Sequence, residues 1–220
     1  HGHTHPSAQA PFGMIQLGPN TRYEGWDGCG GYHYTDSAMY GFSCTHLSGT
    51  GVSDYGDLLM LPYSSPTKEG DHIKFFKEDE HAQAGYYACI LDDGTRIEAT
   101  AGDRTGILRI RFGEGGEPGI MIDLNFRDRV LKKSFEATGI GEWQGSRISE
   151  GWAREQHFYF GLEITARPDT AIEVSDGVYW IPMPEGTRET TVRMGMSGTS
   201  EQGAWMNTIA ELTNKNFEEV

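Results

Sequence analysis

The chain has 220 residues, of which 37% are hydrophobic and 11% aromatic, so it is long enough to bury a core in one sizeable β domain or two small ones. Its 18 basic and 32 acidic residues leave a formal net charge of −14, which argues against nucleic acids and acidic membrane surfaces as partners but leaves neutral ligands open. No segment approaches the roughly 18 consecutive apolar residues of a membrane-spanning helix.

Residues 1–66 are irregular and rich in glycine and aromatic residues. Their densest part is GWDGCGGYHYTDSAMYGFSCTHLSGTGVSDYGD, residues 25–57. Trp26 and the tyrosines of this segment sit among glycines rather than in alternating runs, which favours an exposed rim, although a core position stays open for each tyrosine. Aromatic rings stack on the C–H faces of sugars, and Asp, Asn and His bind hydroxyl edges, so the mixture suits a neutral carbohydrate.

Other polar residues of this region allow more than one interpretation. Asp54 and Asp57 form a close carboxylate pair, but spacing in sequence cannot place two carboxylates across a scissile bond, and aspartates beside glycines commonly close Asx turns. The alternating His1, His3 and His5 could converge on a metal or make hydrogen bonds in a polar loop. The three cysteines show no CxxC spacing, so they allow at most one disulfide and favour buried thiols.

After residue 72 the pattern changes to alternation of apolar and polar residues, which predicts strands. In YYACILDDGTRIEATA, two such runs flank Asp93-Gly94, and this pair predicts a tight hairpin turn. Further strands are expected in ILRIRF, GIMIDLN, FYFGLEITA, VYWI and TTVRMGM, and the earlier apolar run DLLMLPY could be a buried strand. About seven or more strands with one apolar face each predict an all-β fold, an antiparallel β-sandwich.

The end of the chain, SEQGAWMNTIAELTNKNFEEV, predicts a helix. Trp205, Ile209 and Leu212 recur at i, i+4 and i+7, and Ser200 suits the N-cap. This C-terminal helix could pack on a sheet or lead into a further domain. The chain begins at His1 rather than Met, so we expect the N-terminus of the protein and any signal peptide to lie outside this sequence.

Five segments occur in order over essentially the whole chain: GHTHPSAQAPFGMIQLGPNTR, GWDGCGGYHY, GFSCTHLSGTGVSDYGDLLMLP, GWAREQHFYFGLEIT and MGMSGTSEQGAWMNTIAE. They resemble the N-terminal domain of glycoside hydrolase family 92, the calcium-dependent exo-acting α-mannosidases. The resemblance implies a β-sandwich over residues 1–198. It also implies a helical linker over residues 199–220 that leads to an (α/α)6 catalytic domain of the same polypeptide.

For the whole protein, the resemblance implies an inverting hydrolysis of terminal α-mannosides of glycans by a periplasmic or secreted bacterial enzyme. The acid, the base and most calcium ligands would belong to the helical domain, so no catalytic residue is expected in this chain and the isolated domain is expected to be inactive. The alternative from another class is a non-catalytic carbohydrate-binding module or a structural scaffold.

The resemblance also implies supporting roles in substrate binding for Gly25, Trp26, Asp27, His46, Asp54 and Asp57. The turn of residues 25–27 matches the family segment that presents an aromatic ring to the sugar, and the other three fall in loops expected to face the partner domain. Family members often have histidine where this chain has Cys44. If that histidine touches ligand, the cysteine would weaken the contact or alter linkage preference; if it only supports the loop, nothing changes.

Overall fold

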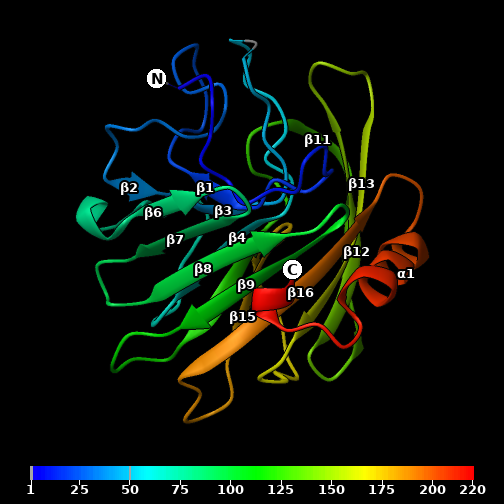
Figure 1. The fold of residues 1–220 in the computed structure, drawn as a ribbon. Helices are drawn as coiled ribbons and strands as arrows, with labels where there is room; N and C mark the ends of the chain where they lie inside the picture. The colour runs from blue at the N-terminus through cyan, green and yellow to red at the C-terminus, as the bar shows by residue number, and fades with distance from the viewer. Residues whose placement is uncertain (1, 50) are drawn as a thin grey trace.

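The computed structural model describes residues 2–49 and 51–220, which fold into an antiparallel β-sandwich with one α-helix near the C-terminus (Figure 1). The first sheet has the order β1 (Gly18–Asn20), β3 (Gly41–Ser43), β4 (Leu59–Tyr63), β10 (Gly119–Asp123), β15 (Val178–Pro182) and β14 (Ile172–Ser175). The second has the order β11 (Arg129–Gly139), β12 (Glu142–Glu150), β13 (Gln156–Ile164), β16 (Glu189–Ser197), β9 (Thr105–Arg111), β8 (Arg96–Ala101), β7 (Tyr86–Ile90) and β6 (His81–Gln83). A short ribbon pairs β2 (Ala38–Met39) with β5 (Ile73–Lys74), and two 3₁₀ turns are η1 (Lys77–Asp79) and η2 (Phe217–Glu219).

The alternating strands bury the faces that the sequence predicts. On β9 and just after it, Leu108, Ile110 and Phe112 are buried, as are the apolar residues of β13. These side chains join one continuous core between the two sheets. The expected all-β sandwich is therefore confirmed.

The predicted hairpin is also confirmed, because β7 and β8 pair around Asp93-Gly94. Gly94 has a φ of +85°, which a residue without Cβ adopts at little cost. The Asp93 carboxylate accepts a hydrogen bond from the backbone N–H of Thr95 at 2.8 Å and closes the turn.

Helix α1 (Glu201–Leu212) begins where the sequence predicts, since the Ser200 hydroxyl accepts a hydrogen bond from the Gly203 N–H. The predicted apolar stripe is wrong at Ile209, which is 64% exposed. The helix instead buries Ala204, Thr208 and Leu212. Small residues allow this face of α1 to approach the sheet closely. A Cβ on Gly195 of β16 would lie only 2.2 Å from the Thr208 hydroxyl oxygen. The helix thus packs on the eight-stranded sheet.

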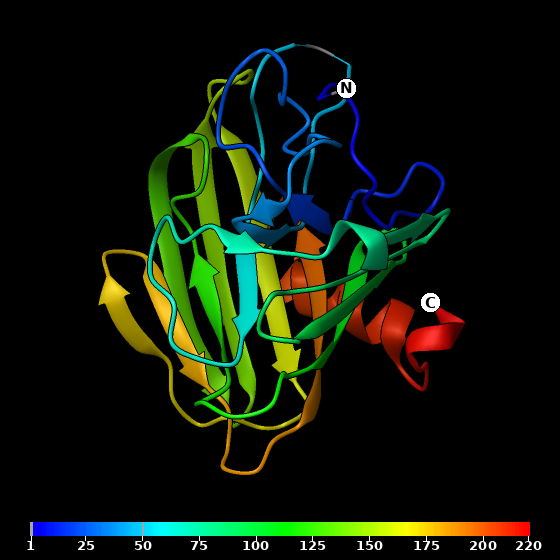
Figure 2. The same ribbon diagram turned by 90° about the vertical axis from the view of Figure 1, so that its left-hand side faces the viewer.

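The long connections gather at one end of the sandwich. Segments 2–6, 22–31, 47–49, 51–54 and 151–155, here called the loop end, lie together there in both views of the fold (Figures 1 and 2). All three cysteines are buried and free, as predicted, and burial raises the pKa of the Cys44 thiol. Within the described ranges, none of the helices has the length and apolar character needed to cross a membrane.

Candidate functional site at the loop end

Trp26 is the most exposed ring of the glycine-rich segment 25–57, with 70% of its surface accessible. Gly51 fixes its position, because a Cβ on Gly51 would lie 2.2 Å from the ring. The ring of His3 meets the indole edge-on, with centroids 5.1 Å apart and an interplanar angle of 72°. The backbone therefore supports one side of the indole, and much of the ring stays open to a ligand.

Asp27 connects this turn to the beginning of the chain. One carboxylate oxygen accepts a hydrogen bond from the Gly2 N–H at 3.0 Å, and the other lies 3.1 Å from Nε2 of His33. These two hydrogen bonds lower the pKa of Asp27, and the bond from the Gly2 N–H has the larger effect. The Ser53 hydroxyl donates to the Gly25 carbonyl at 3.3 Å. These bonds hold the turn of residues 25–27 in place beside the exposed indole.

His46 lies beneath the surface rather than on it. Its Nδ1–H donates to the Gly30 carbonyl at 2.8 Å, and its ring stacks on His5 with centroids 4.6 Å apart. Burial, and then the neighbouring His5, lowers the pKa of His46 well below its usual value, and burial lowers the pKa of His5 to about 4. Both rings are therefore uncharged at neutral pH, and His46 pins the backbone near Gly30.

Asp57 is buried and bonded to a fully buried guanidinium. Arg147, on β12, donates to Asp57 and also to the carbonyls of Leu124 at 3.0 Å and Phe126 at 2.7 Å. The Thr45 hydroxyl donates to the second oxygen of Asp57 at 2.6 Å. Through Arg147, Asp57 joins the two sheets near the loop end, and both of its oxygens are bonded within the domain.

Asp54 is fully buried and organises the loop between β12 and β13. Its carboxylate accepts hydrogen bonds from the Trp152 N–H at 2.9 Å and from the Gln156 amide at 2.8 Å. This contact holds Trp152, which is 68% exposed, at the same end of the sandwich as the turn of residues 25–27. Sequence reasoning missed Trp152, although a Gly-Trp pair in a polar loop, repeating Gly25-Trp26, was a usable signal.

The structure therefore separates the six predicted residues into two groups. Gly25, Trp26 and Asp27 lie at the surface, whereas His46, Asp54 and Asp57 lie below it and bind other parts of the domain. The tyrosines also divide, since Tyr34 is exposed and Tyr32 is buried. Direct substrate contact by the buried group stays a prediction, and their observed bonds position the loops.

The loop end presents no group of three metal-binding side chains among the residues described. His3 and His5 face different rings, and His1 lies outside the described residues. In residues 2–49 and 51–220, no three His, Cys, Asp or Glu side chains are grouped so that they could hold a metal ion. With Asp54 and Asp57 buried, these residues offer an aromatic surface on a polar frame, which can bind and orient a ligand.

Comparisons with known proteins agree with this architecture. The family model for the glycosyl hydrolase family 92 N-terminal domain matches residues 1–207. A family GH92 alpha-mannosidase from Bacteroides thetaiotaomicron is 29% identical, with a TM-score of 0.88 over 100% of this chain and 34% of that chain. A family GH92 inverting mannosidase from the same organism is 21% identical, with a TM-score of 0.82 over 99% of this chain and 32% of that chain, and shows the fold alone.

A curated relative, described as an uncharacterized secreted glycosidase of Arthroderma benhamiae, is 29% identical over 264 residues. The match covers 99% of this chain and 34% of the relative. The chain thus spans about a third of the length of the proteins it matches.

Proposed function

Since the chain belongs to glycosyl hydrolase family 92 as its N-terminal domain, we propose that it forms the sugar-facing wall of a calcium-dependent, inverting exo-α-mannosidase. The observation that carries this proposal is Trp26, an exposed indole held against the backbone of Gly51. The relative named as a family GH92 alpha-mannosidase supports the substrate class, and its greater length supports a further domain in the same polypeptide.

In this proposal the chain's own residues bind and orient the substrate. The open face of Trp26 stacks on the C–H face of a sugar ring, where aromatic stacking adds about 0.5–1.5 kcal/mol beyond burial of area. An inverting hydrolysis needs an acid and a base roughly 6.5–9.5 Å apart with a water between them. The buried Asp54 and Asp57 do not meet this need, so we assign the acid and the base to the rest of the polypeptide, and expect the isolated domain to be inactive.

We further propose that the rest of the polypeptide docks on the loop end and encloses the substrate there. Support comes from the exposed apolar side chains of Trp26, Val52 and Trp152, all in loops at this end. His46, Asp54 and Asp57 serve this interface from below, because they hold the loops that carry the exposed residues. The helical linker of residues 199–220 would connect the two parts.

Calcium belongs to the proposal for the whole enzyme only. Among the described residues, no three His, Cys, Asp or Glu side chains are grouped as metal ligands. We therefore assign most of the calcium ligands to the remaining polypeptide. The expected result is that a calcium chelator abolishes hydrolysis of an aryl α-mannoside by the full-length enzyme and that added calcium restores it; chelator-resistant turnover would contradict this part of the proposal. Export to the periplasm or the medium is proposed as well, in line with the relative described as secreted.

The test of the central proposal is Trp26→Ala in the full-length enzyme. We expect kcat/KM for an aryl α-mannoside to fall about tenfold, a loss of about 1.4 kcal/mol of transition-state binding, with the melting temperature unchanged. The control is Ile140→Ala, which removes an exposed apolar side chain from the turn between β11 and β12, at the opposite end of β12 from the loop end.

Unchanged kinetics of Trp26→Ala would overturn the assignment. A loss of about 3–5 kcal/mol of stability would instead identify Trp26 as a packing residue. Sugar binding by residues 1–220 without any turnover by the full-length protein would favour the alternative, a carbohydrate-binding module or scaffold.

A further inference from the structure

A pocket lies on the outer face of the six-stranded sheet. On β10, Ile122 pairs with Tyr179, whose ring contacts Phe135 of the opposite sheet, so this face of β10 looks into the sandwich. Met121 and Asp123 alternate with Ile122 and face away from it. Residues 69–71 of the segment that follows β4, which runs along this side of the sandwich (Figure 2), line a cavity of about 260 Å³ together with Met121 and Asp123.

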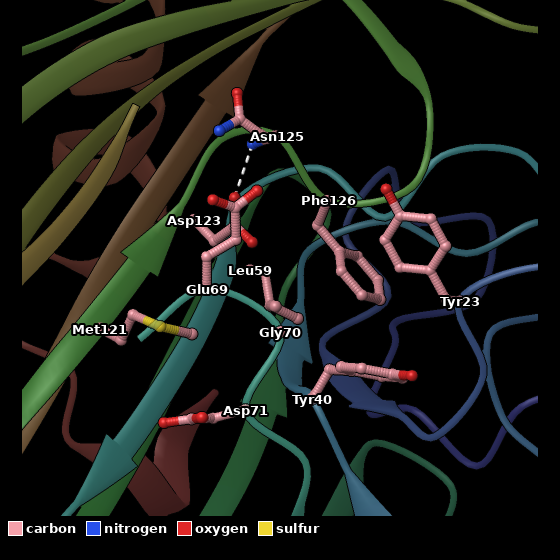
Figure 3. Close-up of a pocket in the computed structure, with 10 residues that line it drawn as sticks. All are labelled: Tyr23, Tyr40, Leu59, Glu69, Gly70, Asp71, Met121, Asp123, Asn125 and Phe126. Atoms are coloured by element: carbon pink, nitrogen blue, oxygen red, sulfur yellow. Dashed lines mark hydrogen bonds between the residues drawn. The ribbon is translucent and has the colours of Figure 1, made fainter. Parts of the chain in front are cut away.

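Three aromatic rings form one wall of this cavity (Figure 3). Tyr23 and Phe126 meet edge-on, with centroids 5.4 Å apart and planes at 89°. Tyr40 lies 5.6 Å from Phe126 and 6.2 Å from Tyr23. At these separations the rings pack against one another, so they form a continuous wall rather than a cage around a small group.

Carboxylates form the facing wall, and the chain does not neutralise them. Asp123 is only 4% exposed; one of its oxygens accepts the Asn125 N–H at 2.7 Å, and its second oxygen has no hydrogen-bond partner among the described residues. Glu69 and Asp71 line the same cavity from the segment that follows β4 (Figure 3). In the part of the chain that the structure describes, no basic group lies within ion-pair distance of these three.

Two basic side chains, Lys133 and Arg147, act on Asp123 electrostatically, but both are bonded to other groups. Lys133 donates to the Asn125 side chain at 2.7 Å and to Asp176 at 2.9 Å, and Arg147 is bound to Asp57. Buried charges in proteins are ordinarily paired, because desolvating an isolated carboxylate is costly. An uncompensated carboxylate at the back of a cavity is therefore suited to a cation.

The size of the cavity selects the kind of cation. The three carboxylates do not qualify as a metal site, since no three potential ligands in the described ranges are grouped closely enough. At about 30 Å³ per water, the cavity has room for roughly nine waters, which matches a six-membered ring with its substituents. The occupant must also present an apolar face to the rings and several donors to the opposite wall.

We propose that this pocket binds a ring-shaped organic cation of the unacetylated aminosugar class. The C–H face of the sugar ring lies on the wall of Tyr23, Tyr40 and Phe126, the ammonium group pairs with Asp123, and hydroxyls donate to Glu69 and Asp71. Trp26 is not among the residues that line this pocket, and the proposed binding does not depend on the proposed mannosidase activity.

The test uses glucosamine as the probe on the full-length protein, at pH 6.5 and low salt, with saturation-transfer NMR to detect the bound sugar. We expect millimolar binding, with the strongest saturation on ring C–H protons. N-acetylglucosamine and mannose have the same ring without the ammonium group, and should bind at least tenfold more weakly. Excess mannose should not displace glucosamine, which separates this pocket from the proposed mannoside site.

Two variants locate the binding. Asp123→Asn keeps the shape and the acceptor for the Asn125 N–H, and should weaken glucosamine binding at least tenfold. Glu69→Gln changes an exposed segment that tolerates substitution, and should weaken it severalfold. The matched control is Glu185→Gln, an exposed carboxylate outside the pocket, which should leave binding unchanged.

The proposal is overturned if glucosamine gives no saturation transfer, if N-acetylglucosamine binds equally well, or if Asp123→Asn binds like the wild type. A calcium ion that binds in the pocket in place of glucosamine would equally overturn it. If the full-length wild-type protein binds glucosamine but does not hydrolyse an aryl α-mannoside, only the proposed function is contradicted.

Discussion

Replacement of Arg147 by methionine should be among the most destabilising single changes in the described structure. The guanidinium is fully buried and donates to Asp57 and to the carbonyls of Leu124 and Phe126. Methionine fills similar space but leaves a buried carboxylate with Thr45 as its remaining side-chain donor.

Removing one partner of a buried ion pair costs about 3–5 kcal/mol, because the other charge stays buried without compensation. Domains of this kind are stable by about 5–15 kcal/mol, so the variant would lose a large part of its margin. Adding Asp57→Asn to Arg147→Met removes the uncompensated charge. The double variant should therefore be more stable than Arg147→Met alone, which is a non-additive result that only a coupled pair produces.

Urea unfolding of the chain, followed by tryptophan fluorescence, measures this. With a slope of about 3 kcal/mol per molar urea, the midpoint of Arg147→Met should fall by about 1–2 M. The matched control is Arg129→Met, which breaks the ion pair with Glu150. The side chain of Arg129 is 77% exposed and that of Glu150 is 43% exposed. Exposed pairs contribute at most about 1 kcal/mol. If Arg147→Met unfolds at the same urea concentration as Arg129→Met, the assignment of Arg147 as a buried link between the two sheets is wrong.

Three further changes test other parts of the fold. Burial raises the pKa of Asp128 to about 7, above its usual value near 4. Its contribution to stability is therefore full below about pH 4 and is lost as the pH rises to about 7, so Asp128→Asn should flatten the decline in melting temperature between pH 4 and 7. Ser200→Ala removes the N-cap of α1 and should cost about 1 kcal/mol in urea unfolding, and an unchanged midpoint would contradict the cap. At Gly161 a Cβ would lie 2.8 Å from the Trp205 ring, so Gly161→Ala should cost about 1–3 kcal/mol, whereas Gly198→Ala, with nothing closer than 3.9 Å, should stay within about 0.5 kcal/mol of the wild type.

The sequence predicted the elements of the fold that depend on residues close together in the chain. Alternation located the strands, Asp93-Gly94 located the hairpin, and Ser200 located the start of α1. The prediction that Ile209 lies on the buried face of α1 was wrong, because close approach to Gly195 determines which face of the helix packs on the sheet. No helical periodicity in the segment itself contains that information.

The candidate site was predicted as a set of residue types and not as an arrangement. Asp54 and Asp57 appeared free in sequence because their partners are far along the chain: Gln156 is 102 residues from Asp54, and Arg147 is 90 residues from Asp57. Trp152 was missed for the same reason, since the bond from its N–H to Asp54 joins residues that are 98 positions apart. Distant pairings of this kind determine which polar residues a ligand can reach.

The proposed sugar contact of Trp26 should be sensitive to mutations of Gly51. Its Cβ position is occupied by the indole of Trp26, and its φ of +75° is one that other residues rarely adopt. A substitution at position 51 would displace the ring while leaving Trp26 itself intact. In a selection for altered substrate preference, variants should therefore arise at this glycine, which has no side chain with which to touch a sugar.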